Sequence, residues 1–282
     1  MKKIFLILGL VILTINIEAQ TNKFYVGISG GYGLGVFKND IVFNNDIVNS
    51  QILLGYQMFN SDSSQVSGER ISLTEGFNVN FAFGYNINNK FSIEISARYT
   101  KSNDFSTERY IVEEYPKPTN YRSTINSESI FIIPQIKYYF DTNKVSPYIK
   151  TGLIISSSVV YYNIDADLYL GMYFNEKAKY KFYDGYNLGF YNAIGAEYNL
   201  SKHISLFGDI SISVINFSHK KLKRTEMVVA GVDENDNERD NGPKEIDLYK
   251  SYDVDENYVK SALTQIFPAS NIALNIGVQF NF

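Results

Sequence analysis

Ionisable side chains occupy alternate positions along several extended segments of the sequence. There are six of them, three cationic and three anionic: Glu94, Arg98, Lys137, Lys150, Glu197 and Asp209. If the segments enclose an interior, these charges either neutralise one another as a plug or line a path for ions or protons. A narrow interior is about filled by its own side chains, so we predict a charge-balanced plug and keep a narrow channel as an alternative.

Catalysis by a general base would need a histidine with an orienting partner. The sequence has two histidines. His203 falls in a short turn, whereas His219 follows the outer end of an extended segment, where a site at the rim would place its base. No partner for His219 is identifiable from sequence. We therefore predict that the protein is not an enzyme, with a rim site near His219 as the alternative.

No cofactor or metal site is predicted. The chain has no cysteine, which excludes thiolate ligands. The acidic run at 233–240 offers oxygen ligands that Ca²⁺ accepts, but it lacks the glycine and terminal glutamate of an EF-hand, so we interpret it as a solvated loop.

Eight extended segments form the framework on which the six ionisable residues lie. In each, apolar residues recur at every second position and small or polar residues fill the others, which is the pattern of a strand. Crossing a bilayer with a tilted strand takes roughly 9–11 residues, and most of these segments are long enough. Their bounds are 24–36, 77–87, 91–99, 130–140, 148–159, 188–200, 204–214 and 272–282. In the fourth, Pro134 predicts a bulge or a poorly paired position, because proline donates no ladder hydrogen bond.

The connections between the segments alternate in length. Three are short turns rich in Asn, Asp and Ser, at 88–90, 141–146 and 201–203, and the others are long and polar, at about 38–69, 102–124, 163–185 and 218–268. Short periplasmic turns and long extracellular loops are typical of outer-membrane barrels. The sequence therefore predicts an all-β fold, a transmembrane up-and-down antiparallel β-barrel of eight strands with both termini periplasmic. Ten strands are the alternative.

The first residues have the pattern of a cleaved signal peptide. Lys2 and Lys3 precede an apolar run over 4–15, and Ala19 precedes the predicted cleavage site. We assign 1–19 to the signal peptide and 20–282 to the barrel domain. The chain has a formal net charge of −4, and this mild acidity argues against nucleic-acid binding.

Two stretches carry a family resemblance. Residues 132–140 read Ile-Ile-Pro-Gln-Ile-Lys-Tyr-Tyr-Phe, and Pro147-Tyr148-Ile149-Lys150-Thr151-Gly152 follows a short turn. This hairpin resembles the PorT-like outer-membrane β-barrel family of the Bacteroidota. The resemblance implies integral insertion in the outer membrane and little about activity. The last residues, Val278, Phe280 and Phe282, resemble the signal read by the barrel-assembly machinery.

We expect such a barrel to present its long loops at the cell surface, for binding or as a subunit of a surface complex, because long loops usually carry binding. Outer-membrane lipid, the assembly machinery and a protein partner at the loops are the expected partners. A basic cluster formed by Lys220, Lys221, Lys223 and Arg224 has two interpretations. It either meets lipopolysaccharide phosphates or is the solvated base of a loop.

Overall fold

The structure is a computed structural model that describes residues 23–36, 39–40, 70–111, 119–140, 144–169, 173–229, 232–233, 245–249, 254–255, 258–259, 261–263 and 266–282. The predicted signal peptide and the acidic run 234–240 lie outside these ranges. Within them, no helix is long and apolar enough to cross a membrane.

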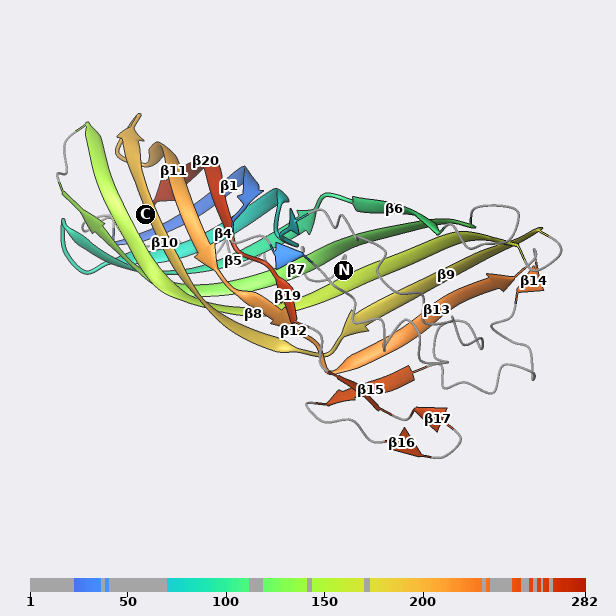
Figure 1. Cartoon of the computed structure of the whole chain (residues 1–282). Coiled ribbons are helices and arrows are strands. Elements are labelled where there is room, and N and C mark those ends of the chain that lie inside the picture. Colours follow the sequence, from blue (N-terminus) through green and yellow to red (C-terminus); the bar gives the residue numbers. More distant parts are fainter. Residues whose placement is uncertain are drawn as a thin grey trace.

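Eight long strands form the barrel. They are β1 (Phe24–Gly35), β4 (Gly76–Asn86), β5 (Phe91–Ser102), β7 (Thr119–Tyr139), β8 (Val145–Tyr169), β10 (Tyr186–Asn199), β11 (Ile204–Val214) and β20 (Asn271–Asn281). They pair antiparallel in the order β8-β10-β11-β20-β1-β4-β5-β7, and β7 pairs back onto β8, which closes the ring (Figure 1). The prediction of a closed eight-stranded antiparallel barrel is confirmed, and the ten-stranded alternative is excluded.

The register shows how strongly the strands are staggered. Directly paired residues can be followed once around the barrel from β8 back to β8, through Ser156, Phe131, Arg98, Asn80, Ser29, Gly277, Phe207, Glu197 and Ser146. The circuit returns ten residues nearer the start of β8, from position 156 to position 146. Closing a sheet with such a stagger requires tilted strands, so residues at equal distances from the turns need not be direct neighbours.

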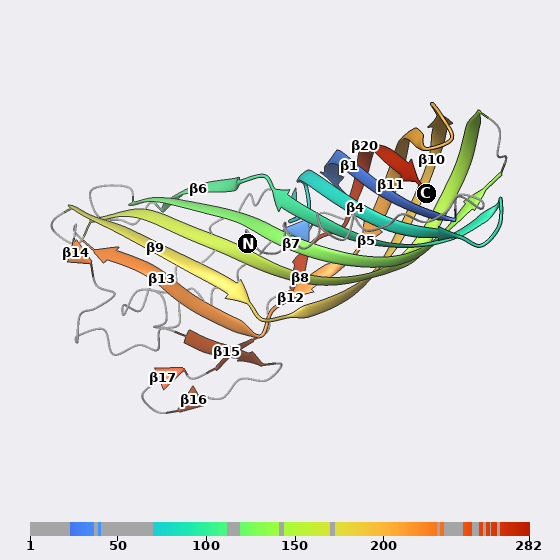
Figure 2. The same ribbon diagram turned by 180° about the vertical axis from the view of Figure 1, so that it is seen from behind.

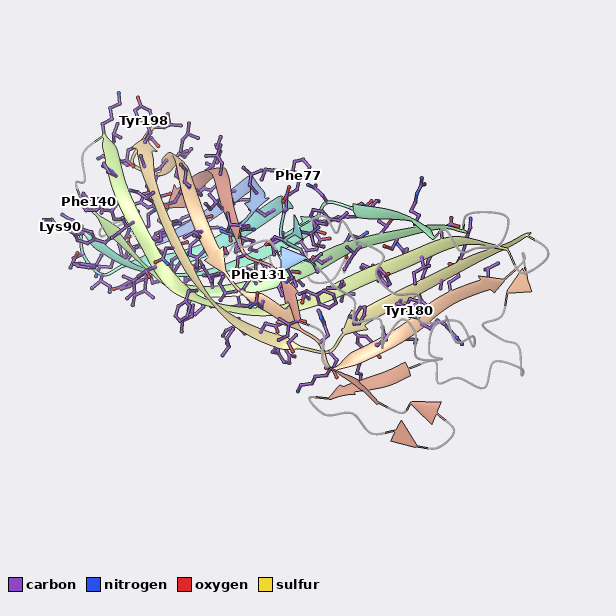
Figure 3. The ribbon with its side chains drawn as sticks, in the orientation of Figure 1. Phe77, Lys90, Phe131, Phe140, Tyr180 and Tyr198 are labelled. Atoms are coloured by element: carbon purple, nitrogen blue, oxygen red, sulfur yellow. The ribbon has the colours of Figure 1, made fainter. Side chains whose placement is uncertain are left out.

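Side chains alternate between the lumen and the outer wall. In β5 every second residue is buried and every other one is exposed. The outer positions carry large apolar side chains, and Leu188 exposes 79% of its surface and Phe77 71%. Figure 3 shows these side chains projecting from the wall, with Phe140 and Tyr198 near the end that carries the short turns. An apolar band around the outside of a closed barrel is the face that meets hydrocarbon.

The barrel wall continues on one side beyond this band. β7 and β8 have 21 and 25 residues, and β6 (Phe105–Ile111), β9 (Tyr173–Tyr183), β13 (Lys221–Val229), β14 (Val232–Asp233), β15 (Glu245–Tyr249) and β18 (Ser261–Leu263) enlarge the sheet beside them. Figures 1 and 2, which view the molecule from opposite sides, show this wall extension projecting beyond the barrel.

Three of the predicted connections contribute strands to the wall extension. Within the described residues, much of 102–124, most of 163–185 and parts of 218–268 are β-strand. The physical reason is that the alternation of buried and less buried residues continues there: Tyr162 and Ile164 are buried, whereas Tyr161 and Asn163 are only partly buried. Of the predicted loop 38–69, only 39–40 lies within the described residues.

Three short strand pairs complete the described structure. They are β2 (Asn39–Asp40) with β3 (Arg70–Ile71), β12 (Asn216–Ser218) with β19 (Ile266–Pro268), and β16 (Val254–Asp255) with β17 (Tyr258–Val259). At the opposite end of the barrel, the Phe282 N–H donates to the Phe24 carbonyl at 2.8 Å, so both described ends lie beside the short turns.

Pro134 disturbs the ladder without a bulge. The nearby Ile132 and Gln135 pair with Ile155 and Gly152 in one unshifted register, but Ile133 and Pro134 pair with no residue of β8. The predicted poorly paired position is therefore present, and the predicted bulge is not.

Candidate functional site

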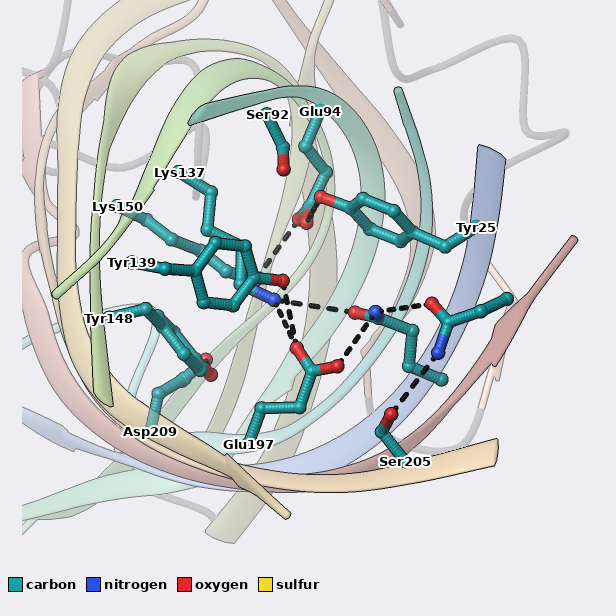
Figure 4. Close-up of polar contacts among 12 residues, drawn as sticks. Tyr25, Ser92, Glu94, Lys137, Tyr139, Tyr148, Lys150, Glu197, Ser205 and Asp209 are labelled. Carbon is teal, nitrogen blue, oxygen red and sulfur yellow. Dashed lines mark hydrogen bonds and ion pairs between the residues drawn. The ribbon is translucent and has the colours of Figure 1, made fainter. Parts of the chain in front are cut away.

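The lumen contains a layer of buried charge near the end that carries the short turns. The Lys137 Nζ lies 2.8 Å from Glu197 Oε2, and the Lys150 Nζ lies 3.1 Å from Glu94 Oε1. Both pairs are almost fully enclosed, and they come from β7, β10, β8 and β5. Figure 4 shows these four side chains converging on the barrel axis. The alternation of the strands explains why all four side chains point into the lumen.

Tyrosine hydroxyls donate hydrogen bonds to the three carboxylates of the lumen. The Tyr25 hydroxyl donates to Glu94 Oε2 at 2.8 Å, and the Tyr139 hydroxyl donates to Glu197 Oε2 at 2.9 Å. Tyr148 donates in the same way to Asp209 Oδ2 at 3.0 Å (Figure 4). The sequence places these tyrosines on the inward face, but it gives no sign of which carboxylate each one meets.

Amides complete the layer. Gln279 Nε2 donates to Glu197 Oε1 at 3.0 Å, and its Oε1 accepts from the Lys137 Nζ at 3.3 Å. Asn275 Nδ2 donates to Asp209 Oδ1 at 2.8 Å. Buried charges are tolerated only with such hydrogen bonds and opposite charges, so the arrangement is chemically a filled plug.

The other two residues of the predicted charge network stand apart from the ion pairs. Asp209 is bonded to neutral partners only among the described contacts, and Arg98 donates from Nη2 to the Tyr191 hydroxyl at 3.2 Å. The guanidinium carbon of Arg98 also lies 4.9 Å from the centre of the Tyr191 ring. Four of the six predicted residues are therefore joined as two ion pairs, and two are not.

An apolar layer that sequence reasoning missed lies on the outer side of the charges. Phe131 and Ile133 precede Lys137 on the descending β7, and Ile154 follows Lys150 on the ascending β8, so all three are farther from the short turns. They pack with side chains from the connections, among them Leu73, Phe217 and Phe267. The lumen is filled by two chemically different layers in series.

His219 lies in this apolar layer rather than at an open rim. Its exposed fraction is 0%, and the rings of Phe182, Phe217 and Phe267 lie 5.7 to 6.5 Å away between centroids. Nε2 lies 3.1 Å from the Ser158 carbonyl oxygen and donates to it, while Nδ1 has no partner. Burial lowers the pKa of His219 to about 4.

This lowered pKa predicts a pH-dependent stability. The unfolded chain binds the proton near pH 6.5 and the folded protein near pH 4, so stability is complete above pH 6.5 and falls as the pH drops towards 4. The loss is about 3 kcal/mol. Urea midpoints in lipid vesicles between pH 7 and 4 should fall less steeply for His219→Gln than for the wild type. His203→Gln, an exposed histidine in a short turn, is the matched control and should follow the wild type. Equal slopes for all three proteins would contradict the prediction.

The predicted basic cluster is divided between the two faces of the wall. Arg224 is buried on the inner side, whereas Lys220 and Lys223 are exposed. Lys223 lies directly opposite Lys181 of β9. Val278 and Phe280 of the predicted assembly signal lie on β20 and Phe282 directly follows this strand; Phe280 and Phe282 expose their rings on the outer wall.

Residues 5–233 match the family described as the outer membrane protein beta-barrel domain. The chain belongs to this family. It is accordingly an integral outer-membrane β-barrel protein, as the closed barrel and its apolar outer band imply. No curated protein sequence matches this member of the outer-membrane barrel family. Its narrower resemblance to PorT-like proteins stays a prediction.

Solved structures similar to this family member include bacterial outer-membrane and surface proteins. Neisserial surface protein A is 12% identical with a TM-score of 0.39, covering 94% of this chain and 100% of that one. A major outer membrane protein from Thermus thermophilus is 11% identical with a TM-score of 0.38, covering 92% and 98%. Ail, the attachment invasion locus protein of Yersinia pestis, is 9% identical with a TM-score of 0.28, covering 92% and 97%. Similarity at this level carries no information about ligands or activity.

Proposed function

We propose that this barrel holds a rigid surface platform outside the membrane and binds a protein partner there, alone or as a subunit of a surface complex. The observation that carries the proposal is the wall extension. A tilted strand crosses the membrane in roughly 9–11 residues, and β7 and β8 have 21 and 25. Their excess length stands beyond the apolar band as a continuous sheet.

The outer face of β9 gives this platform a defined chemistry. Lys177, Lys179 and Lys181 alternate with the buried Ala178 and Tyr180, so the three lysines share the outward face. The first two are held in ion pairs with neighbouring strands at 3.6 and 2.6 Å. A sheet displays such side chains in fixed positions, which lowers the entropy cost of binding.

The proposal includes a closed lumen and no catalysis. The charged layer and the apolar layer lie one above the other, and a conducting path would have to cross both. His219 has the chemistry of a base but is enclosed by three phenylalanine rings, so a substrate could not reach its free Nδ1 without displacing them. We therefore propose neither a channel nor an enzyme.

Membrane lipid and the assembly machinery complete the proposed partners. The Lys220 backbone N–H donates to the carbonyls of Tyr183 and Asp184. These residues shortly precede the outward-facing Tyr186, so Lys220 lies at the edge of the apolar band that is nearer the wall extension. There its ammonium group would meet lipopolysaccharide phosphates. The outward Phe280 supports the proposal that the last strand is read during assembly.

Site-specific photocrosslinking in cells tests the platform. A photoreactive amino acid replaces Lys177 or Thr225, both exposed on the wall extension, and Lys90 in a periplasmic turn is the matched control position. We expect a discrete protein adduct from positions 177 and 225, and we expect that position 90 does not give the same adduct. Absence of a discrete adduct from the extension, or the same adduct from all three positions, would count against the platform.

A further inference from the structure

One buried cation of the lumen has no counter-ion. Arg98 exposes 3% of its surface, and its described polar contact is the hydrogen bond to the neutral Tyr191 hydroxyl. Its Nε has no partner. Lys137 and Lys150, the other two inward cations, each have a carboxylate within 3.1 Å. Among the described residues, no carboxylate forms an ion pair with Arg98.

The third inward carboxylate does not fill this role. Asp209 is on β11, and its oxygens accept from Tyr148 and Asn275 rather than from Arg98. A charge enclosed without a counter-ion is unfavourable, so a folded barrel that keeps Arg98 buried must compensate it. The Tyr191 ring, 4.9 Å from the guanidinium carbon, supplies part of this compensation, and an anion that enters the lumen would supply the rest.

The wall around Arg98 is lined with polar atoms that lack partners. On β4, Asn80 lies directly opposite Arg98, and Asn78 lies opposite Thr100, the next inward residue of β5. Ser129 of β7 lies opposite Thr100 on the other side. Directly paired residues have Cβ atoms about 5 Å apart, so these five residues form one continuous surface, the Arg98 patch. Each of the other four is buried and has a side-chain oxygen without a partner.

The chemistry of the Arg98 patch suits an anion. The donors without a partner are the Arg98 Nε–H and the hydroxyls of Thr100 and Ser129, which rotate to donate, whereas the unpartnered Oδ1 atoms of Asn78 and Asn80 are acceptors. Leaving buried donors unbonded is unfavourable, so a ligand that accepts from these three groups is favoured. Phe131, which lies directly opposite Arg98 on β7, limits the space. We propose that the Arg98 patch binds one small monovalent anion of the size of chloride inside the barrel.

Anomalous diffraction with bromide in place of chloride tests the site directly. We expect a bromide peak within hydrogen-bond distance of the Arg98 guanidinium in wild-type crystals. Bromide found only at the outer surface, or water alone at the patch, would overturn the proposal. This measurement needs no variant, so it decides even if changes at Arg98 prevent folding.

A solution experiment adds a second readout. At constant ionic strength, replacing gluconate by chloride should raise the urea midpoint of the wild-type barrel, because a ligand that binds only the folded state stabilises it. Arg98→Met should lose this rise, and Lys101→Met, which removes an exposed cation three residues along the same strand, should keep it. An equal chloride effect on all three proteins would contradict a site at Arg98.

Discussion

Replacing Lys137 by methionine is expected to lower the free energy of unfolding by about 3–5 kcal/mol. The Lys137 side chain is 1% exposed, and its Nζ is 2.8 Å from Glu197 Oε2. The same ammonium group lies 4.6 and 4.3 Å from the ring centres of Tyr139 and Tyr148. Methionine fills similar volume but removes the charge, so Glu197 is left ionised and enclosed with only neutral donors.

A second substitution, in the carboxylate that pairs with Lys137, separates the effect of charge from the effect of packing. Adding Glu197→Gln to Lys137→Met removes the stranded carboxylate, and we expect the double variant to regain much of the lost stability. Lys101→Met is the matched control, because Lys101 faces outward, 3.7 Å from a half-exposed Glu128. Such exposed pairs contribute at most about 1 kcal/mol. Urea titration of protein refolded in vesicles measures all three, and a double variant no more stable than Lys137→Met would refute the charge explanation.

Period-two alternation was sufficient to predict the barrel and the direction of each side chain. A strand has only two faces, so once the apolar residues are assigned to lipid, Glu94 and Lys137 must point inward. This inference uses only local sequence, and the burial of both side chains agrees with it.

The partners inside the lumen depend on information that alternation does not contain. The ten-residue stagger decides that Lys137 reaches Glu197 and that Lys150 reaches Glu94, and it leaves Arg98 and Asp209 apart. The sequence contains six inward charges that sum to zero, but it does not show the strand register that decides which of them pair. Charge balance therefore predicted a plug without predicting which cation would lack a counter-ion.

The apolar layer and the wall extension escaped prediction for a different reason. Phe217 and Phe267 belong to connections whose path is not fixed by strand periodicity. The segment 173–183 alternates lysines with Ala178, Tyr180 and Phe182, and its high charge resembles a loop. Only pairing with β8 and β13 makes it a strand, and pairing is a tertiary property.

Glycine at position 84 makes room for the Tyr25 ring, and Gly84→Ala is expected to destabilise the barrel by about 3–5 kcal/mol. A Cβ added there would overlap Tyr25 ring and hydroxyl atoms directly. Because Gly84 and Tyr25 face each other across β4 and β1, neither backbone can retreat without breaking the ladder. The ring must move, and its hydrogen bond to the buried Glu94 is lost with it.

Gly208→Ala is the matched control, since the nearest atom to its added Cβ would be 3.6 Å away, in ordinary contact. It should change the urea midpoint little. In a Tyr25→Leu background, Gly84→Ala should cost much less than in the wild type, because the ring it displaces is gone. Equal costs in the two backgrounds would show that Gly84 is needed for its backbone alone. A reduced cost would show instead that Gly84 sets where the Tyr25 ring lies, and through it the hydrogen bond that Tyr25 donates to the buried Glu94.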